Sequence, residues 1–141
     1  MIRATDLSSA PLEDTGAAPS YRLCLTLSEH SAVHLRRILR AHLYAWGMPH
    51  LADASCLALT ELAANVVHHV RDRRCTVRIL RRPAGVRVEV TDTSPCLPHL
   101  PCEENPLAEG GRGLHLVEAV TDRWGARRSG AGKTVWFECE A

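Results

Sequence analysis

Two periods of apolar and polar residues alternate along this chain, and each change of period marks an expected element. Residues 21–27 alternate apolar and polar positions, which predicts a strand. Residues 29–46 and 51–70 then repeat their apolar positions every three or four residues, as amphipathic helices do. Ser28 is the expected N-cap of the first helix, and Gly47 is its expected stop. The first half of the chain therefore predicts one strand followed by two helices.

The second half of the chain returns to the two-residue alternation of strands. Residues 75–80 and 86–91 both alternate, and a turn containing Pro and Gly separates them, so they predict a β-hairpin. A proline-rich stretch with no usable period follows. Residues 114–121 then have helical spacing, and residues 123–128 and 133–140 predict a second pair of strands.

The order of these elements indicates the fold class. Hairpins separated by helices are typical of an α+β two-layer sandwich, in which a mixed, largely antiparallel sheet carries its helices on one face. Residues 21–141 are long enough for one domain with a buried core. Residues 1–20 are rich in Ser, Ala, Pro and acidic side chains without a sustained period, so we expect them to form a flexible tail.

Composition narrows the classes of function. The 17 basic and 16 acidic residues give a net charge of +1, so no global field favours nucleic acid or a membrane. The chain has no apolar run of about 18 residues and no apolar core of a signal peptide near Met1, which favours a cytoplasmic protein. Its six cysteines form no CxxC pair and are expected to be reduced, buried thiols. A metal site of Cys96, His99 and Cys102 lacks recognised zinc spacing.

Arginine is frequent over residues 71–87, where Asp72 is the only opposing charge. A nucleic-acid-binding face is one interpretation. However, Arg78 and Arg87 occupy outward positions of the alternating strands. A solvated hairpin face, or contact with an acidic protein, explains the pattern better.

Polar side chains recur on the second predicted helix at intervals of one turn. Glu61, Asn65 and His69 are spaced at i, i+4 and i+8, so they form one stripe. A carboxylate and a carboxamide one turn apart can share a small ligand or a hydrated cation. By itself, the stripe is more simply explained as the solvent-exposed face of an amphipathic helix.

Two further segments favour a nucleotide site. Asp92 stands where the second strand of the first hairpin ends, and residues 110–113 bring three glycines to the start of a helix. Glycines there let backbone amides approach a phosphate, and the helix N-terminus favours negative charge. The segment is neither a Walker A loop nor a dinucleotide fingerprint.

In this order, these segments resemble the GHKL ATPases, the superfamily of gyrase, Hsp90, histidine kinases and MutL. Residues 61–69 resemble its N box, and residues 90–95 stand in the place of the next box. Residues 110–117 resemble the glycine box, and residues 132–136 resemble the closing strand. The resemblance runs from about residue 21 to the C-terminus and is closest to stand-alone anti-sigma-factor serine/threonine kinases of actinobacterial type.

The resemblance implies a role for each matched residue. Asn65 would coordinate the Mg²⁺ that bridges the ATP phosphates, Glu61 would be the general base, and His69 would shape the same end of the helix. Asp92 would accept a hydrogen bond from the adenine amino group, with the Thr134 hydroxyl nearby. The phosphates would be met through side chain and backbone by Gly111, Arg112, Gly113 and Leu114.

The segment after Asp92 departs from the superfamily pattern. The usual box reads Asp-x-Gly-x-Gly, whereas Ser94 and Pro95 follow here after Thr93. A proline-restrained turn thus replaces a permissive glycine turn. This replacement of glycine by Ser94 and Pro95 is compatible with adenine recognition by Asp92. It brings into question both the mobility of a lid over residues 94–109 and the hydrolysis of ATP.

The resemblance implies an ATP- and Mg²⁺-binding anti-sigma factor with serine/threonine protein kinase activity. Such a protein would hold a sigma factor inactive or phosphorylate an anti-anti-sigma protein of STAS type, and the family often forms homodimers. The Ser94–Pro95 turn leaves open a catalytically weak module that binds only nucleotide or protein. The catalytic domain of a histidine kinase is another alternative, but its dimerisation and phospho-acceptor helices would have to lie on a separate chain.

Overall fold

The computed structural model describes residues 19–97 and 110–141, the last range with backbone only at 110–113. Within these ranges, five strands form one sheet in the order β1-β2-β3-β5-β4, and all four pairings are antiparallel. Their bounds are β1 (Ser20–Thr26), β2 (Arg74–Arg82), β3 (Gly85–Asp92), β4 (Arg123–Ser129) and β5 (Gly132–Glu140).

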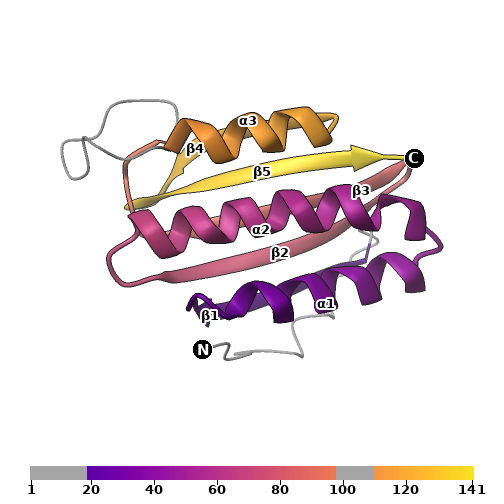
Figure 1. Cartoon of the computed structure of the whole chain (residues 1–141), viewed down its shortest axis with the longest axis horizontal. Coiled ribbons are helices and arrows are strands. Elements are labelled where there is room, and N and C mark those ends of the chain that lie inside the picture. The colour runs from indigo at the N-terminus through magenta and orange to yellow at the C-terminus, as the bar shows by residue number, and fades with distance from the viewer. Residues whose placement is uncertain (1–18, 98–109) are drawn as a thin grey trace.

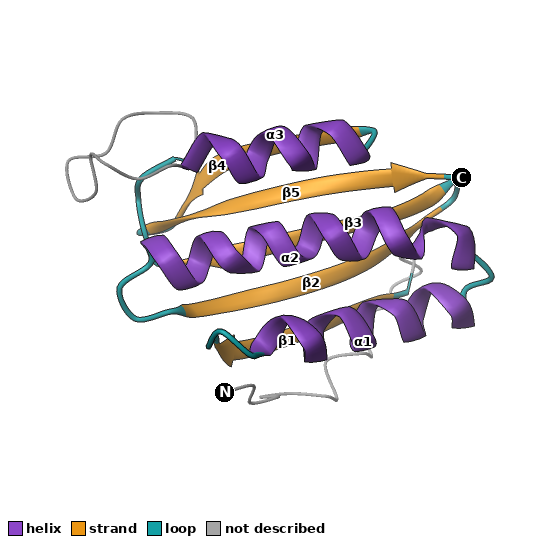
Figure 2. Cartoon of the chain, viewed as in Figure 1, coloured by secondary structure: helices purple, strands orange, loops and turns teal. Residues whose placement is uncertain are grey.

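The described part of the chain has three α-helices: α1 (Ser31–Ala45), α2 (Ala52–His69) and α3 (Gly110–Val120). They lie on one face of this sheet, as Figure 1 and Figure 2 show. Helix α2 is central and packs against α1 on one side and α3 on the other. The α+β two-layer class predicted from the pattern is therefore confirmed, with an antiparallel rather than a mixed sheet.

The core lies between the helices and the sheet face they cover. Alternation along the strands sends Leu23 of β1, Val77 of β2 and Phe137 of β5 to this face, and all three are buried. Leu39 of α1 and Leu59 of α2 face them from the helix layer and are completely buried. Each such side chain contributes about 1.5–3 kcal/mol of transfer free energy, so this layer supplies most of the stability.

Two helix starts differ from the pattern-based prediction. Helix α1 begins at Ser31 rather than at residue 29, because Ser28 forms a turn in which its backbone N–H donates to Ser31 Oγ at 2.9 Å. Helix α3 begins at Gly110 rather than at Leu114, so the glycine-rich segment is the first turn of the helix. Before α2, the chain makes a single 3₁₀ turn, η2 (Pro49–Leu51).

The uncovered face of the sheet carries an ion-pair network. Arg87 Nε contacts Glu89 at 2.8 Å and its Nη1 contacts Glu138 at 2.9 Å. Arg78 adds a 3.2 Å contact to Glu89, and Arg123 a 2.9 Å contact to Glu138. Arg78 and Arg87 of the hairpin are thus paired with carboxylates within the molecule.

Thiols occupy several core positions. Cys24, Cys56, Cys75 and Cys139 are outside any disulfide, and burial raises the pKa of the Cys75 thiol to about 12. Cys96, however, is disulfide-bonded, so the expectation of reduced cysteines is wrong at that residue.

Within the two described ranges, no helix combines the length and the apolar character needed to cross a membrane. Likewise, no three His, Cys, Asp or Glu side chains of these ranges cluster closely enough to hold a metal ion. His99 and Cys102 of the weighed zinc site lie outside the described residues, as do residues 1–18 of the expected tail and most of the expected lid.

Candidate nucleotide site

Several of the predicted site residues lie at one end of the sheet. Helix α2 ends there with His69, strand β3 ends there with Asp92, and β5 begins there directly opposite, with Asp92 paired to Lys133. The first turn of α3 also lies at this end, on the left in Figure 1. Segments far apart in the sequence are therefore brought together by the antiparallel order of β3 and β5.

Asp92 is the most deeply buried of the predicted acidic residues, with only 3% of its side chain exposed. Its Oδ1 accepts hydrogen bonds from the Ser94 backbone N–H at 2.9 Å and from Lys133 Nζ at 3.1 Å. Its Oδ2 lies 3.0 Å from the same Nζ. Asp92 is thus held as one member of a buried ion pair.

Opposing influences act on the pKa of Asp92. Burial raises it, because desolvation penalises the carboxylate, while the Lys133 ammonium and the Ser94 N–H oppose that rise. The net pKa stays above its ordinary value. The ionised state of this carboxylate therefore depends on its two partners.

Thr134 is not brought together with Asp92. Successive residues of a strand point to opposite faces, and Thr134 lies on the uncovered face, where its Oγ1 is 2.7 Å from Thr91 Oγ1. Lys133 occupies the position beside Asp92 instead. The sequence contained this signal, because Lys133 shares its alternation phase with Val135 and Phe137, which face the core.

The polar stripe of helix α2, formed by Glu61, Asn65 and His69, is partly buried. The side chains of Glu61 and Asn65 are both partly exposed, and neither side chain hydrogen-bonds to a residue in the described ranges. Burial, followed by the charges of His68 and Lys133, lowers the pKa of His69, so its imidazole is neutral at physiological pH. The carboxylate of Glu61, the carboxamide of Asn65 and the neutral imidazole of His69 therefore lie along the C-terminal half of this helix.

Helix α3 supplies backbone rather than side chains to the described part of the site. Leu114 is 4% exposed and packs in the core, so only its backbone is available to a ligand. Gly111, Arg112 and Gly113 lie in the first turn of α3, and their side chains are outside the described part. The first four N–H groups of a helix have no partner within it, and they attract anions.

The turn after Asp92 is tied down by hydrogen bonds. Besides the Ser94 N–H bond to Asp92, the Cys96 N–H donates to Ser94 Oγ at 3.3 Å. Arg128 Nη1 of β4 donates to the Pro95 carbonyl oxygen at 2.7 Å. The proline-restrained turn predicted from the sequence is therefore also held by the neighbouring strand.

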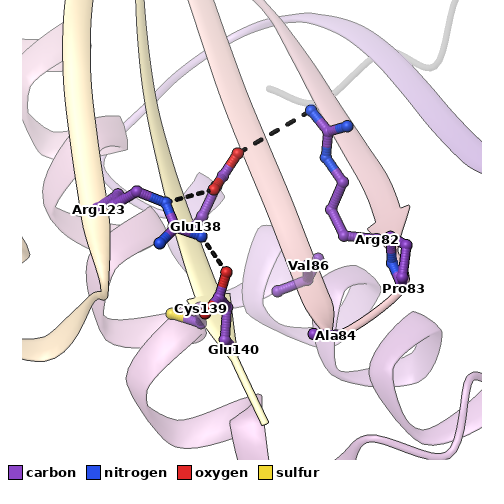
Figure 3. Close-up of a pocket in the computed structure, with 8 residues that line it drawn as sticks. All are labelled: Arg82, Pro83, Ala84, Val86, Arg123, Glu138, Cys139 and Glu140. Atoms are coloured by element: carbon purple, nitrogen blue, oxygen red, sulfur yellow. Dashed lines mark hydrogen bonds and ion pairs between the residues drawn. The ribbon is translucent and has the colours of Figure 1, made fainter.

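A pocket of about 390 Å³ lies at the opposite end of the sheet, between the β2–β3 turn and the end of β5 (Figure 3). Arg82 and Arg123 flank it, and both reach Glu138. Because β3 begins and β5 ends there, this pocket is separated from Asp92 by the full length of both strands. It does not belong to the predicted nucleotide site.

The fold is an α+β domain in which the three described α-helices cover one face of an antiparallel sheet, and α2 ends and α3 begins at the end of the sheet that carries Asp92. Residues 25–139 match the family model of the histidine kinase-like ATPase domain, so the chain belongs to this family. It is also 38% identical, over 85 residues, to an uncharacterized protein of Streptomyces coelicolor. That alignment covers 58% of this chain and 79% of the relative.

The donor set of the site fits the ATP and Mg²⁺ that this family implies. The Asn65 carboxamide offers the kind of oxygen that hard cations prefer, and it is half-exposed without a partner among the described residues. The Asp92 carboxylate offers an acceptor in a buried position, where hydrogen bonds to charged groups are strongest. Bound Mg²⁺ would neutralise charge on the phosphates.

Proposed function

We propose that this protein is an ATP-binding anti-sigma factor with serine/threonine protein kinase activity in a partner-switching system. The observation that carries the proposal is the alignment of Glu61 and Asn65, both unengaged among the described residues, on the helix that ends beside the buried Asp92. A base, a metal ligand and an adenine acceptor are the three groups that a small nucleotide-dependent kinase needs.

Each residue has a separate task in this proposal. Asp92 accepts a hydrogen bond from the exocyclic amine of adenine and so selects the base. Asn65 holds Mg²⁺ against the phosphates, and the first-turn N–H groups of α3 bind phosphate oxygens. Glu61 takes the proton of the attacking serine hydroxyl as general base. Gly111, Arg112 and Gly113 meet the phosphates through backbone and the arginine side chain.

The proposed partners are a sigma factor, held inactive, and an anti-anti-sigma protein of STAS type, whose serine receives the phosphoryl group. Phosphorylation adds charge of about −1.5 to −2, which is enough to break a protein contact. Location in the cytoplasm and formation of a homodimer belong to the same proposal. Direct contact with nucleic acid does not, since Arg78 and Arg87 are ion-paired within the molecule.

The test is phosphoryl transfer from labelled Mg-ATP to a STAS-type protein captured from the native cell. We predict that Glu61→Gln retains ATP affinity, because Asn65 and Asp92 bind the nucleotide, but lowers transfer by about 10²–10⁴-fold, the usual contribution of a general base. Asp53→Asn is the matched control, because this carboxylate is on the same helix and is 97% exposed. Equal transfer rates for the wild type and Glu61→Gln would contradict the role of Glu61.

The second candidate function is a nucleotide-binding module with little catalysis. It is favoured by the turn from Asp92 to Cys96, which Ser94, Asp92 and Arg128 hold by hydrogen bonds. If labelled ATP binds but no phosphate reaches any captured partner at saturating Mg-ATP, the kinase proposal fails. Partner capture that depends on ATP would then support the module.

A further inference from the structure

Lys133 is the only lysine in the chain, and it is nearly buried, with 9% of its side chain exposed. It is the second residue of β5 and lies directly opposite Asp92 in the β3–β5 register. Removing an ammonium group from water costs several kcal/mol unless an opposite charge compensates for it. The Asp92–Lys133 pair therefore needs an explanation beyond packing, since apolar residues such as Val135 and Phe137 fill the same face of β5.

The hydrogen bonds of the Asp92 carboxylate leave acceptor capacity for another donor. Oδ1 accepts two hydrogen bonds, from Ser94 and Lys133, whereas Oδ2 is contacted by Lys133 alone among the described residues. A carboxylate has about four acceptor positions, so Oδ2 can still take a hydrogen bond.

The identity of the cation matters for this remaining capacity. The ammonium of a lysine is a compact point charge that can approach both oxygens from one position. The planar guanidinium of an arginine would pair with both oxygens side by side and occupy the edge of the carboxylate.

We propose that Lys133 is a positioning residue of the nucleotide site, which keeps Asp92 ionised and oriented so that Oδ2 accepts a hydrogen bond from the exocyclic amine of the base. This inference rests on the proposed function, because it takes ATP as the ligand. It assigns to β5 a residue that selects the base by acting through Asp92 rather than by touching the ligand.

The surroundings of the pair support this role. Asp92 is faced by Lys133 from β5, by Cys75 from β2 and by Asp72 from the turn before β2, while His69 of α2 faces Lys133. Lys133 and the Ser94 N–H lower the pKa of Asp92, whereas burial and the charge of Asp72 raise it. Removing the ammonium leaves a buried carboxyl group that takes up a proton at higher pH.

The experiment compares Lys133→Met, which removes the charge at similar volume, with Lys133→Arg, which keeps the charge but changes its geometry. Arg127→Met is the matched control, because Arg127 is an exposed basic residue of the adjacent strand β4. Two quantities are measured: the Asp92 carboxyl titration by ¹³C NMR in ligand-free protein, and the affinity for ATP and inosine triphosphate by calorimetry from pH 6 to 8.

We expect Lys133→Met to raise the titration midpoint of Asp92 and to lose about tenfold or more in ATP affinity at pH 6, with recovery as the pH rises. It should also lose most of the preference for ATP over inosine triphosphate, which lacks the amine. Lys133→Arg should leave Asp92 ionised yet bind ATP more weakly, and Arg127→Met should behave as wild type.

Three results would overturn the inference. The first is an Asp92 midpoint in Lys133→Met equal to that of the wild type. The second is unchanged base preference in both Lys133 variants, which would make the lysine purely structural. The third is tighter ATP binding by Lys133→Met at every pH, which would mean that the lysine occludes the site. Failure of the wild type to bind ATP would instead refute the proposed function, while the ligand-free titration would still decide whether Lys133 controls Asp92.

Discussion

At the scale of single residues, Asp92 combines burial with charge. Its side chain is only 3% exposed. The buried charge is stabilised because Lys133 and the Ser94 N–H compensate for the lost hydration. The same burial makes a hydrogen bond from a ligand strong, since little water competes for the acceptor. Asp92 is therefore the residue at which the specificity of the proposed site should be most sensitive to substitution.

We predict that Asp92→Asn lowers ATP affinity by about 10- to 100-fold, which corresponds to the roughly 1.5–3 kcal/mol of a hydrogen bond to a charged group. Calorimetry with ATP and inosine triphosphate measures the effect, and the loss should fall mainly on ATP. Asp72→Asn is the matched control, because Asp72 is an exposed carboxylate near Asp92 that bonds the Thr93 hydroxyl and the Arg74 N–H. Equal ATP affinity in the two variants would remove Asp92 from the site.

Residue-scale prediction from the sequence succeeded where spacing alone determines geometry. Glu61 and Asn65 share a helix face because they are one turn apart, and the structure places both there, half-buried. The resemblance placed the Thr134 hydroxyl near the adenine contact of Asp92, whereas in the structure that hydroxyl lies 2.7 Å from Thr91 Oγ1, on the other face of the sheet. A shift of one residue reverses the face, and the β3–β5 register sets Lys133 directly opposite Asp92.

At the scale of elements, α1 is anchored through His42. Its ring lies between Tyr21 of β1, at 4.6 Å between centroids, and Trp46, at 5.3 Å. Its Nδ1 is 3.1 Å from the Ile38 carbonyl oxygen. Burial lowers the pKa of His42, because desolvation disfavours the imidazolium.

This pKa shift predicts the sign of a pH effect on stability. A histidine whose folded-state pKa is depressed binds fewer protons when folded, so the free energy of unfolding falls as the pH drops below the unfolded-state value of about 6.5. Urea denaturation between pH 5 and 8 should show this loss, and His42→Gln should reduce it. His34→Gln, at an exposed position of the same helix, is the control. An identical pH dependence in His42→Gln and wild type would contradict the role of His42.

The entry of β5 is the second element-scale feature. A side chain at Gly132 would overlap the Asp92 carbonyl oxygen, so β3 and β5 can approach this closely only with glycine there. We predict that Gly132→Ala costs about 1–3 kcal/mol of stability and also weakens ATP binding, because β5 must move away from Asp92. The control, Gly130→Ala, is strained only by its φ of +61° and should lose stability without losing ATP affinity. Unchanged ATP affinity in Gly132→Ala would show that the site tolerates displacement of β5.

Periodicity predicted every described strand and α-helix, with shifts at their ends, but not the short 3₁₀ turn η2. Strand ends were each placed within two residues, since two-residue alternation continues up to the turns. The start of α3 was missed because glycine disfavours a helix interior, yet Gly110 to Gly113 form its first turn in the structure. Helix ends depend on capping contacts, such as Ser28 N–H to Ser31 Oγ, that periodicity does not contain.

At the scale of the whole molecule, the two ends of the sheet differ in chemistry. One end carries Asp92 and Lys133, and α2 ends and α3 begins there (Figure 1). The other end carries the ion pair of Glu138 with Arg87 and its ion pair with Arg123, the second of which Figure 3 shows. The sequence could not predict these cross-strand pairs, because the order β3-β5-β4 brings together residues that are up to about fifty positions apart. Strand order is a tertiary property, whereas periodicity is local.

Because the two ends of the sheet are far apart, ligand binding at the Asp92 end and stability at the Glu138 end should respond to different substitutions. Mg-ATP at 100 times its dissociation constant should stabilise the wild type by about 2.7 kcal/mol, which raises Tm by roughly 10 °C for a domain of this size. Asn65→Ala should abolish the shift while leaving the ligand-free Tm nearly unchanged, because the Asn65 side chain is partly exposed and hydrogen-bonds to no described residue.

Glu138→Gln is the control for the distant end of the sheet. It should lower the ligand-free Tm, because Arg87, which is largely buried, loses a charged partner, but it should retain the full shift with Mg-ATP. Thermal unfolding with and without Mg-ATP measures the ligand-free Tm and the shift in Tm caused by the ligand. A ligand-induced shift that disappears in Glu138→Gln and persists in Asn65→Ala would place the nucleotide at the wrong end of the sheet, beside the pocket of Arg82 and Arg123 rather than beside Asp92.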